Sequence, residues 1–193
     1  MINQICAGIL AGGKSSRMGT NKMLLTRNGR TFLEHTYDIC SVFPQRLVSV
    51  RDKNQYADFS MPFVEDEKEG FGPLEGIRQF LLASDHPYVF VLAGDMPFLT
   101  ENFLRAFANR LNPKDDCLVL QTGEKLIEPL CAIYAVRILP ALEQLQKEGI
   151  RKPRVLFDRT NTRFVDVYEL GFPPEIVENI NTREDYNRIR DLG

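Results

Sequence analysis

The sequence has no apolar run that approaches the ~18 residues needed to span a membrane, and no basic N-terminal segment precedes an apolar stretch. We therefore expect no membrane segment and a cytoplasmic location. A strong excess of basic residues is also missing, because 24 Lys and Arg stand against 26 Asp and Glu. The net charge of −2 argues weakly against a dedicated nucleic-acid-binding protein, since such proteins usually carry a basic face.

Cysteine and histidine are scarce, at four and two residues. The cysteines lie in apolar surroundings without Cys-x-x-Cys spacing, which predicts buried thiols rather than a zinc site or a disulfide framework. They are Cys6, Cys40, Cys117 and Cys131. His35 has no acidic or histidine partner at metal-binding spacing, and His86 precedes a predicted strand, so we expect both to lie outside the chemistry.

Internal repeats, low-complexity tracts and interdomain linkers are absent from the sequence. A chain of 193 residues can bury one sizeable core, so we expect a single domain over residues 1–193. Apolar runs alternate with helical patterns, as in βα units that build a mainly parallel sheet. We therefore predict an α/β fold: a Rossmann-like three-layer domain with a mostly parallel central sheet and a small antiparallel excursion.

The predicted elements follow this alternation. Strands are expected at 4–11, 47–50, 61–64, 88–93, 117–121, 127–134 and 163–167, and helices at 31–43, 74–83, 101–111 and 137–147. Residues 117–121 and 127–134 are too close in sequence for a crossover helix, so this pair is expected to be antiparallel. Thr31 is a predicted helix cap, and Thr182 with Asp185 resembles a capping box.

The first predicted strand runs into a basic, glycine-rich loop. Gly12 and Gly13 allow unusual backbone conformations and leave room for a ligand against the peptide N–H groups. Arg17 and Lys22 are suited to neutralise phosphate oxygens. The spacing differs from that of a P-loop and of a dinucleotide-binding fingerprint. The loop is therefore either another kind of phosphate-binding loop or a strand-to-helix turn with solvent-facing cations.

Asp95 follows the continuous apolar run 88–93, which is typical of a central strand covered on both faces. Ligands of open α/β sheets collect at the carboxyl ends of strands, so this carboxylate is well placed to meet what the first loop binds. The alternative is a local role, as an Asx turn or as the N-cap of the helix that starts near Thr100.

Residues 10–25 resemble the molybdenum cofactor guanylyltransferase family, whose motif is Leu-Ala-Gly-Gly-x-Ser-x-Arg-Met-Gly-x-Asp-Lys-x-Leu-Leu. One position departs from the motif, because Asn21 stands where the family has aspartate. Asn accepts the same backbone hydrogen bonds as Asp, so we expect the shape of the loop to be kept. The resemblance implies that Leu10, Ala11, Gly12, Gly13 and Lys22 bind the nucleotide.

Further blocks at 66–76, 94–97, 128–134 and 179–185 are similar to the same family. By this resemblance, Asp66 lies at the base or sugar, Asp95 binds Mg²⁺, and Asn179 and Asn181 complete the phosphate or metal environment. Glu128 either faces the acceptor pterin or is an edge-strand charge. The cations Arg151, Lys152 and Arg154 either steer an anionic acceptor or form a solvated face.

The resemblance implies a Mg²⁺-dependent enzyme that transfers GMP from GTP to molybdopterin, with Arg17, Lys22 and Asp95 as catalytic residues. Molybdoenzyme apoproteins or cofactor-delivery proteins are further expected partners. Three alternatives remain at this stage: a molybdopterin cytidylyltransferase, a sugar-phosphate nucleotidyltransferase, and a non-catalytic adaptor that binds the nucleotide or the cofactor. The cytidylyl relatives resemble Leu-Ala-Ala-Gly where this chain has residues 10–13 as Leu-Ala-Gly-Gly.

Overall fold

The computed structural model describes residues 1–12, 21–68, 70–124 and 126–190. Its main feature is a seven-stranded sheet with the order β5-β4-β1-β6-β8-β7-β9. The strands are β1 (Ile5–Leu10), β4 (Gln45–Val50), β5 (Phe63–Glu65), β6 (Tyr88–Ala93), β7 (Cys117–Gly123), β8 (Leu126–Ala135) and β9 (Thr162–Asp166). β8 runs antiparallel to both neighbours, and every other pairing is parallel. The predicted sheet and its antiparallel excursion are thus confirmed.

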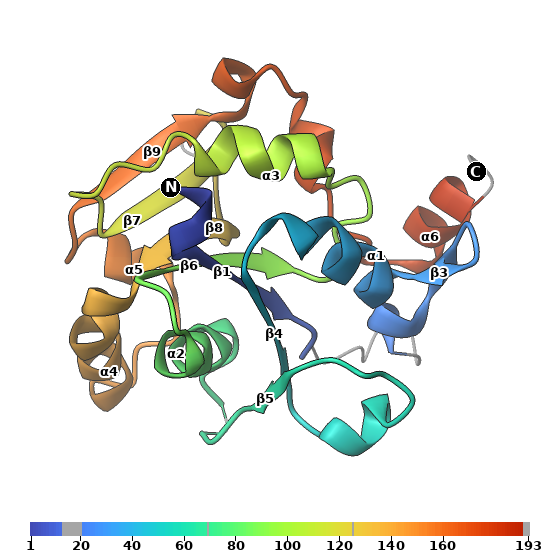
Figure 1. The fold of residues 1–193 in the computed structure, drawn as a ribbon, viewed down its shortest axis with the longest axis horizontal. Helices are drawn as coiled ribbons and strands as arrows, with labels where there is room; N and C mark the ends of the chain where they lie inside the picture. Colours follow the sequence, from blue (N-terminus) through green and yellow to red (C-terminus); the bar gives the residue numbers. More distant parts are fainter. Residues whose placement is uncertain (13–20, 69, 125, 191–193) are drawn as a thin grey trace.

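Helices cover both faces of this sheet and complete a three-layer domain (Figure 1). α2 (Pro73–Ala83) and α4 (Leu139–Lys147) pack together on one face, and α1 (Phe32–Ile39) and α3 (Glu101–Ala108) lie on the other (Figure 1). The shorter helices are α5 (Arg154–Phe157), at one end of the sheet, and α6 (Arg183–Arg190), beside the small antiparallel hairpin β2 (Thr26–Arg27) and β3 (Arg30–Thr31). Single 3-10 turns are η1 (Ile2–Gln4), η2 (Lys22–Leu24), η3 (Cys40–Val42), η4 (Lys53–Tyr56), η5 (Val136–Ile138), η6 (Val167–Leu170) and η7 (Pro174–Val177).

Both predicted helix caps are present. The Thr31 hydroxyl accepts from the Glu34 N–H at 3.1 Å, and the Glu34 carboxylate accepts from the Thr31 N–H at 2.8 Å. Asp185 and Thr182 exchange the equivalent pair of bonds at 2.8 and 3.0 Å. These reciprocal bonds pair N–H groups that the first helical turn leaves without a partner.

Several predicted ends were wrong by a few residues; the helix expected over 31–43, for example, ends at Ile39 and is followed by the 3-10 turn η3. Three other ends differ for a local reason. The helix expected over 101–111 stops at Ala108, because the N–H groups of Arg110 and Leu111 donate to carbonyls three residues earlier. The helix expected from 137 begins at Leu139, where Pro140 fits the first turn because it has no N–H to donate. The strand expected from 61 begins at Phe63, since Pro62 cannot donate to a ladder.

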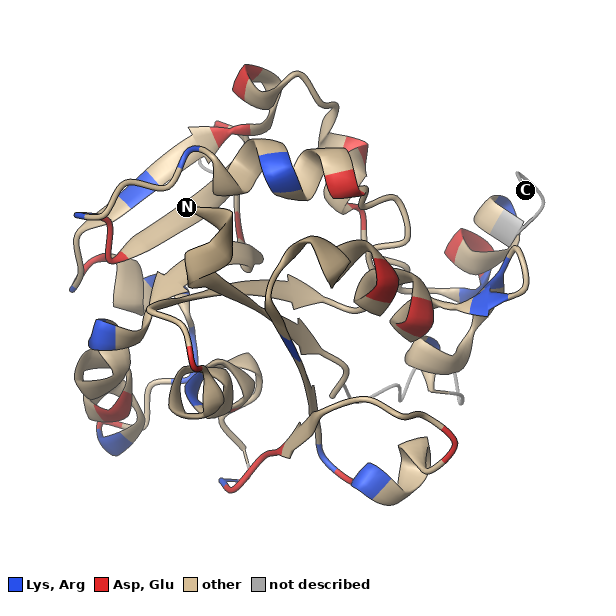
Figure 2. Ribbon diagram, viewed as in Figure 1, with Lys and Arg blue, Asp and Glu red and all other residues tan. Residues whose placement is uncertain are grey.

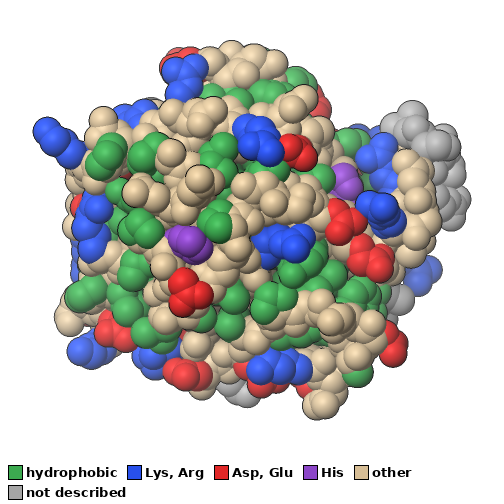
Figure 3. Space-filling view, in the orientation of Figure 1, with side chains coloured by type: hydrophobic (Ala, Val, Ile, Leu, Met, Phe, Trp, Pro, Cys, Tyr) green, Lys and Arg blue, Asp and Glu red, His purple; other side chains and the backbone are tan. Residues whose placement is uncertain are grey.

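Charges of both signs are spread over the ribbon, and apolar and charged side chains are mixed on the face seen in space-filling view (Figures 2 and 3). Within the described residues, no helix has the length and apolar character of a membrane span. All four cysteines are free and buried, as predicted. Burial raises the pKa of Cys117 to about 11, so this thiol stays protonated near neutral pH.

The core is packed closely where helices meet the central strands. On one face of the sheet the Phe90 ring of β6 contacts Phe107 of α3, with ring centroids 5.3 Å apart. On the other face Phe80 of α2 lies directly over Gly8 of β1, where an added Cβ atom would be only 2.5 Å from the ring. The missing side chain at Gly8 therefore lets α2 approach the sheet.

We expect Gly8→Ala to lower the free energy of unfolding by about 1–3 kcal/mol, because the fully buried Phe80 ring must shift within a packed core. Gly123→Ala is the matched control, since its Cβ atom would meet only ordinary contact at 3.5 Å from Leu126. Urea denaturation of both variants measures the difference. Equal losses would show that close approach at Gly8 is unimportant.

Candidate active site

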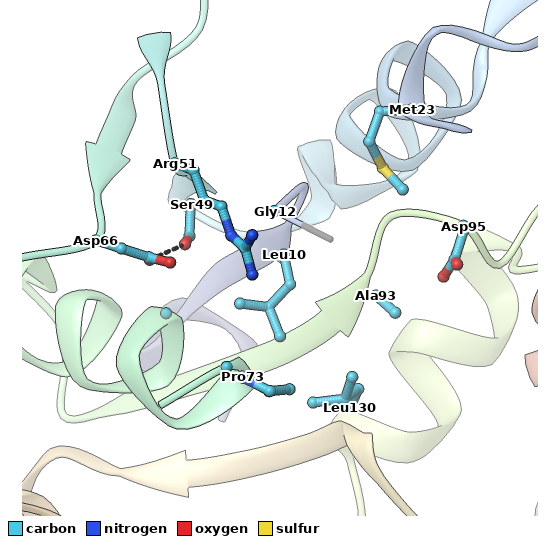
Figure 4. A pocket seen from close by; sticks show the side chains of 12 residues that line it. Leu10, Gly12, Met23, Ser49, Arg51, Asp66, Pro73, Ala93, Asp95 and Leu130 are labelled. Atoms are coloured by element: carbon cyan, nitrogen blue, oxygen red, sulfur yellow. Dashed lines mark hydrogen bonds between the residues drawn. The ribbon is translucent and has the colours of Figure 1, made fainter. Parts of the chain in front are cut away.

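A cavity of about 300 Å³ opens at the carboxyl ends of β1, β4 and β6 (Figure 4). Parallel strands β4, β1 and β6 are neighbours, so the loops that follow them meet at one edge of the sheet. The cavity is lined by Leu10, Gly12, Met23, Ser49, Arg51, Asp66, Gly72, Pro73, Gly76, Ala93, Asp95 and Leu130. Gly12, Asp66 and Asp95, which the sequence singled out separately, are brought together here.

Asp66 stands at one end of the cavity, directly after β5 (Figure 4). Its N–H donates to the Val50 carbonyl at 3.2 Å, and its carboxylate accepts from the Ser49 hydroxyl at 3.1 Å. Burial raises the pKa of Asp66 above its ordinary value, although the Ser49 hydrogen bond acts in the opposite direction. The Ser49 hydroxyl occupies only one acceptor position of this carboxylate, so the carboxylate can accept further hydrogen bonds from a ligand.

Glu75 of α2 holds the loop that follows Asp66 in place by a hydrogen bond to its backbone. It is fully buried, and its carboxylate accepts from the Glu67 N–H at 3.2 Å, from Gln79 at 2.8 Å and from Gln146 at 2.8 Å. Burial alone would raise the pKa of Glu75, but these amide hydrogen bonds and the Arg78 charge outweigh it and lower the pKa. Sequence reasoning predicted a shaped turn before this helix but assigned no role to Glu75, because its partners Gln79 and Gln146 are recognised only in the folded chain.

Asp95 stands at the other end of the cavity, after β6 (Figure 4). Its carbonyl accepts from the Ile180 N–H at 3.0 Å, which fixes the 179–181 segment beside it. Burial raises the pKa of Asp95, while the Lys22 ammonium, 3.7 Å from the carboxylate, opposes that shift. Thr100 is the N-cap of α3, so Asp95 does not cap that helix.

Lys22 connects the two ends of the chain at this site. Its Nζ donates to Asn181 Oδ1 at 2.9 Å and lies 3.7 Å from Asp95 Oδ2. Asn179 is half-buried next to Ile180, and neither it nor Asn181 lines the cavity within the described residues. Gly13 and Arg17, two further predicted site residues, lie outside the described residues.

Asn21 accepts a backbone hydrogen bond, as expected for this departure from the motif, whereas the shape of the loop over residues 13–20 lies outside the described residues. Its Oδ1 accepts from the Met23 N–H at 3.1 Å and caps η2. Its Nδ2 donates to the hydroxyl of Tyr56 at 2.9 Å, and that hydroxyl donates to the Ala11 carbonyl at 3.0 Å. The hydroxyl has one proton, so it accepts from Asn21 because it donates to Ala11. Sequence reasoning missed the buried Tyr56.

The backbone of Ala11 is fully engaged, since its N–H also donates to the Ser49 carbonyl at 2.9 Å. Leu10 contributes its side chain to the cavity, and its carbonyl accepts from the Gly94 N–H at 3.1 Å. An added Cβ atom at Gly94 would be 2.6 Å from Met23 Sδ and 3.3 Å from the Leu10 carbonyl oxygen, so the missing side chain lets Met23 and the end of β1 approach closely. These hydrogen bonds join the carboxyl ends of β1, β4 and β6, which together form the floor of the cavity.

Glu128, Arg151 and the two histidines are not among the described residues that line the cavity. Glu128 of β8 is half-buried, and burial raises its pKa. Arg151 approaches the loop after Asp66, with Nη2 3.9 Å from where a Cβ atom on Gly70 would lie. His35 Nε2 lies 3.2 Å from the Leu99 carbonyl oxygen, which agrees with a structural role, and His86 precedes β6 at the opposite end of that strand.

The sequence profile of the MobA-like NTP transferase domain matches residues 7–163. The chain belongs to this family. It is 35% identical to a probable molybdenum cofactor guanylyltransferase of Methanosarcina acetivorans, over 92% of this chain and 86% of that protein. It is 32% identical to a molybdenum cofactor guanylyltransferase of Vibrio cholerae, over 92% and 87% of the two chains.

The fold agrees with this assignment. The crystal structure of molybdopterin-guanine dinucleotide biosynthesis protein A from Archaeoglobus fulgidus superposes with a TM-score of 0.82 at 28% identity, covering 97% of each chain. Membership of the MobA-like NTP transferases confirms the resemblance found in the first motif and places the chain among nucleotidyltransferases.

We expect Asn21→Asp to destabilise this MobA-like domain by about 1–3 kcal/mol. A carboxylate cannot donate to Tyr56, so the hydroxyl must either face an unprotonated oxygen or turn away from the Ala11 carbonyl and leave it unpaired. Thermal and urea unfolding measure the loss. In a Tyr56→Phe background the same substitution should cost clearly less, and full additivity of the two changes would disprove the coupling.

Asp95→Asn should leave the metal-free protein equally stable or more stable near neutral pH. The native carboxyl holds its proton more tightly than the unfolded chain does, so stability falls as the pH rises from the ordinary value of 3.8 through the raised native pKa. The advantage of the variant should therefore vanish as the pH is lowered to 3.8. Melting curves in a chelator over a pH series test this, with Asp58→Asn at an exposed position as the control.

Proposed function

We propose that the chain transfers GMP from GTP to the terminal phosphate of molybdopterin, releasing pyrophosphate and forming the guanine dinucleotide cofactor. The two relatives named molybdenum cofactor guanylyltransferase support this choice of nucleotide and acceptor. The chain aligns with most of the length of each, so the proposal concerns the whole of the described domain.

The observation that carries the proposal is the separation of Asp66 from Asp95 along one cavity (Figure 4). The strands before them, β5 and β6, are three positions apart in the sheet, which is about 14 Å at roughly 4.8 Å per strand. This length suits a nucleoside with its first phosphates. Asp66 then meets the base or ribose, and Asp95 with Lys22 meets the triphosphate.

The reaction needs no protein nucleophile, because the acceptor phosphate attacks the α-phosphorus as pyrophosphate leaves. The protein has to align the two substrates and stabilise the developing charge. Lys22 is positioned for this by Asn181, which orients the ammonium without neutralising it. We assign Arg17 the same electrostatic role from its place in the motif.

Asp95 would hold Mg²⁺. Magnesium is usually bound by one or two carboxylates together with substrate phosphates and water, and a single carboxylate at the phosphate end of the cavity fits that donor set. The described residues contain no group of three or more His, Cys, Asp or Glu that could hold an ion without a substrate. When bound, the ion would neutralise phosphate charge during transfer.

We further propose that the protein acts in the cytoplasm and passes its product to molybdoenzyme apoproteins or cofactor-delivery proteins. Four buried, unpaired cysteines support a reducing compartment.

The test is to incubate the protein with Mg²⁺, molybdopterin and GTP, CTP or ATP, and to identify the dinucleotide and the pyrophosphate released. We expect GTP to be preferred by at least ~100-fold, since a site built to pair guanine donors leaves its polar groups unpaired with other bases. Equal turnover of CTP and GTP would overturn the guanylyl assignment, and nucleotide binding without turnover would favour an adaptor.

Lys22→Met should lower kcat by orders of magnitude while the fold is retained. Lys147→Met removes the same charge at the exposed C-terminal end of α4 and should have little effect. Comparable losses in the two variants would mean that general electrostatic attraction, rather than a contact at Lys22, explains the activity.

A further inference from the structure

Arg51 lies at the mouth of the cavity, and neither the motif nor the family resemblance assigns it a role. It directly follows β4, and its guanidinium points into the cavity between Asp66 and Leu10 (Figure 4). Its Cγ atom lies 3.6 Å from where a Cβ atom on Gly12 would be. Arg51 therefore stands over the opening that a nucleotide has to enter.

The position of Arg51 next to Asp66 is fixed by strand register. β4 and β5 pair in parallel with Val50 opposite Glu65, so the residues that follow them, Arg51 and Asp66, lie side by side. The Asp66 N–H donates to the Val50 carbonyl, which continues the pairing to the edge of the cavity. Ser49, on β4, and Arg51, just after its end, both line the cavity.

The charge of Arg51 has no counter-ion within 4.0 Å in the described part of the chain. Several other arginines there are paired with carboxylates, such as Arg78 with Glu67 at 3.0 Å and Arg137 with Asp116 at 2.7 Å. The charge of Arg51 instead acts on the neighbouring Asp66, whose pKa it lowers against the larger effect of burial. A fork of donors is thus held beside an acceptor, and the space between them is open to a ligand.

Guanine presents a matching pattern. Its O6 and N7 atoms are adjacent acceptors, and the N1–H and exocyclic amine next to O6 are donors. We propose that Arg51 is a specificity-determining residue that donates to O6 and N7 of guanine while Asp66 accepts from N1–H and the amine. Adenine places an amine where guanine has O6, so the same two side chains reject it.

This inference rests on the proposed function. It adds Arg51 as the residue that recognises the O6 and N7 edge of guanine, next to the edge that Asp66 contacts. The neighbouring positions of Arg51 and Asp66 favour a base contact over a phosphate contact, because Lys22 and Asp95 occupy the far end of the cavity.

Calorimetric titration with four nucleotides tests the assignment: GTP, 7-deaza-GTP, inosine triphosphate and ATP, each with Mg²⁺. The first analogue lacks only N7, and the second lacks only the exocyclic amine. We expect Arg51→Met to weaken GTP binding roughly 10- to 100-fold, as for loss of a bidentate contact to guanine. The variant should bind GTP and 7-deaza-GTP equally, whereas wild type should prefer GTP.

The preference for GTP over inosine triphosphate should persist in Arg51→Met, because Asp66 still reads the amine. Arg51→Lys, which keeps the charge but not the planar fork, should lose most of the 7-deaza discrimination. Lys53→Met removes an exposed charge from the same segment and should bind all four nucleotides as wild type does. Melting temperatures of the variants establish that each one is folded.

Two results would overturn the inference: retained 7-deaza discrimination in Arg51→Met, or equal weakening of all four nucleotides, which would indicate a phosphate contact. A wild-type protein that binds ATP as tightly as GTP would instead overturn the proposed function, and the role of Arg51 with it.

Discussion

The parallel pairing of β1 with β4 and β6 is the constraint on which the site depends. It places three loops at one edge of the sheet, and the bonds from Ala11 to Ser49 and from Gly94 to Leu10 extend the pairing into those loops. The cavity floor is therefore a continuation of the sheet. A binding site built this way is held by the same hydrogen bonds that hold the fold, so little entropy is lost when a ligand is positioned.

The three buried or half-buried carboxylates at or near the cavity differ in how many hydrogen-bond donors surround them. Glu75 is supplied with amide, backbone and guanidinium donors, which lower its pKa and make it a structural anchor. Asp66 and Asp95 have fewer donors, so burial dominates and their pKa values rise. Incomplete satisfaction of a buried charge is costly in the free protein, and it is what a ligand or a cation can relieve.

Asn21 shows how a departure from a family motif is accommodated by its surroundings. The amide keeps the capping bond to Met23 that a carboxylate would make, and it adds a donor for Tyr56. Tyr56 comes from η4, well away in sequence, and its hydroxyl carries the contact on to Ala11. Asparagine at position 21 thus matches the hydroxyl of Tyr56, a neighbour that the sequence of the first loop does not reveal.

The sequence by itself determined the elements and most of the candidate positions. Apolar runs and helical spacing depend on local chemistry, so the strand order along the chain, the antiparallel pair β7 and β8, and the Thr31 cap were predictable. Asp95 and Lys22 were identifiable because their residue types stand in a recognisable spacing. Only the tertiary structure decided that Lys22 meets Asn181, 159 residues away, and that Arg51 stands beside Asp66. Strand register and long-range packing, rather than local sequence, fix those contacts, because each joins elements whose proximity depends on the whole sheet being assembled.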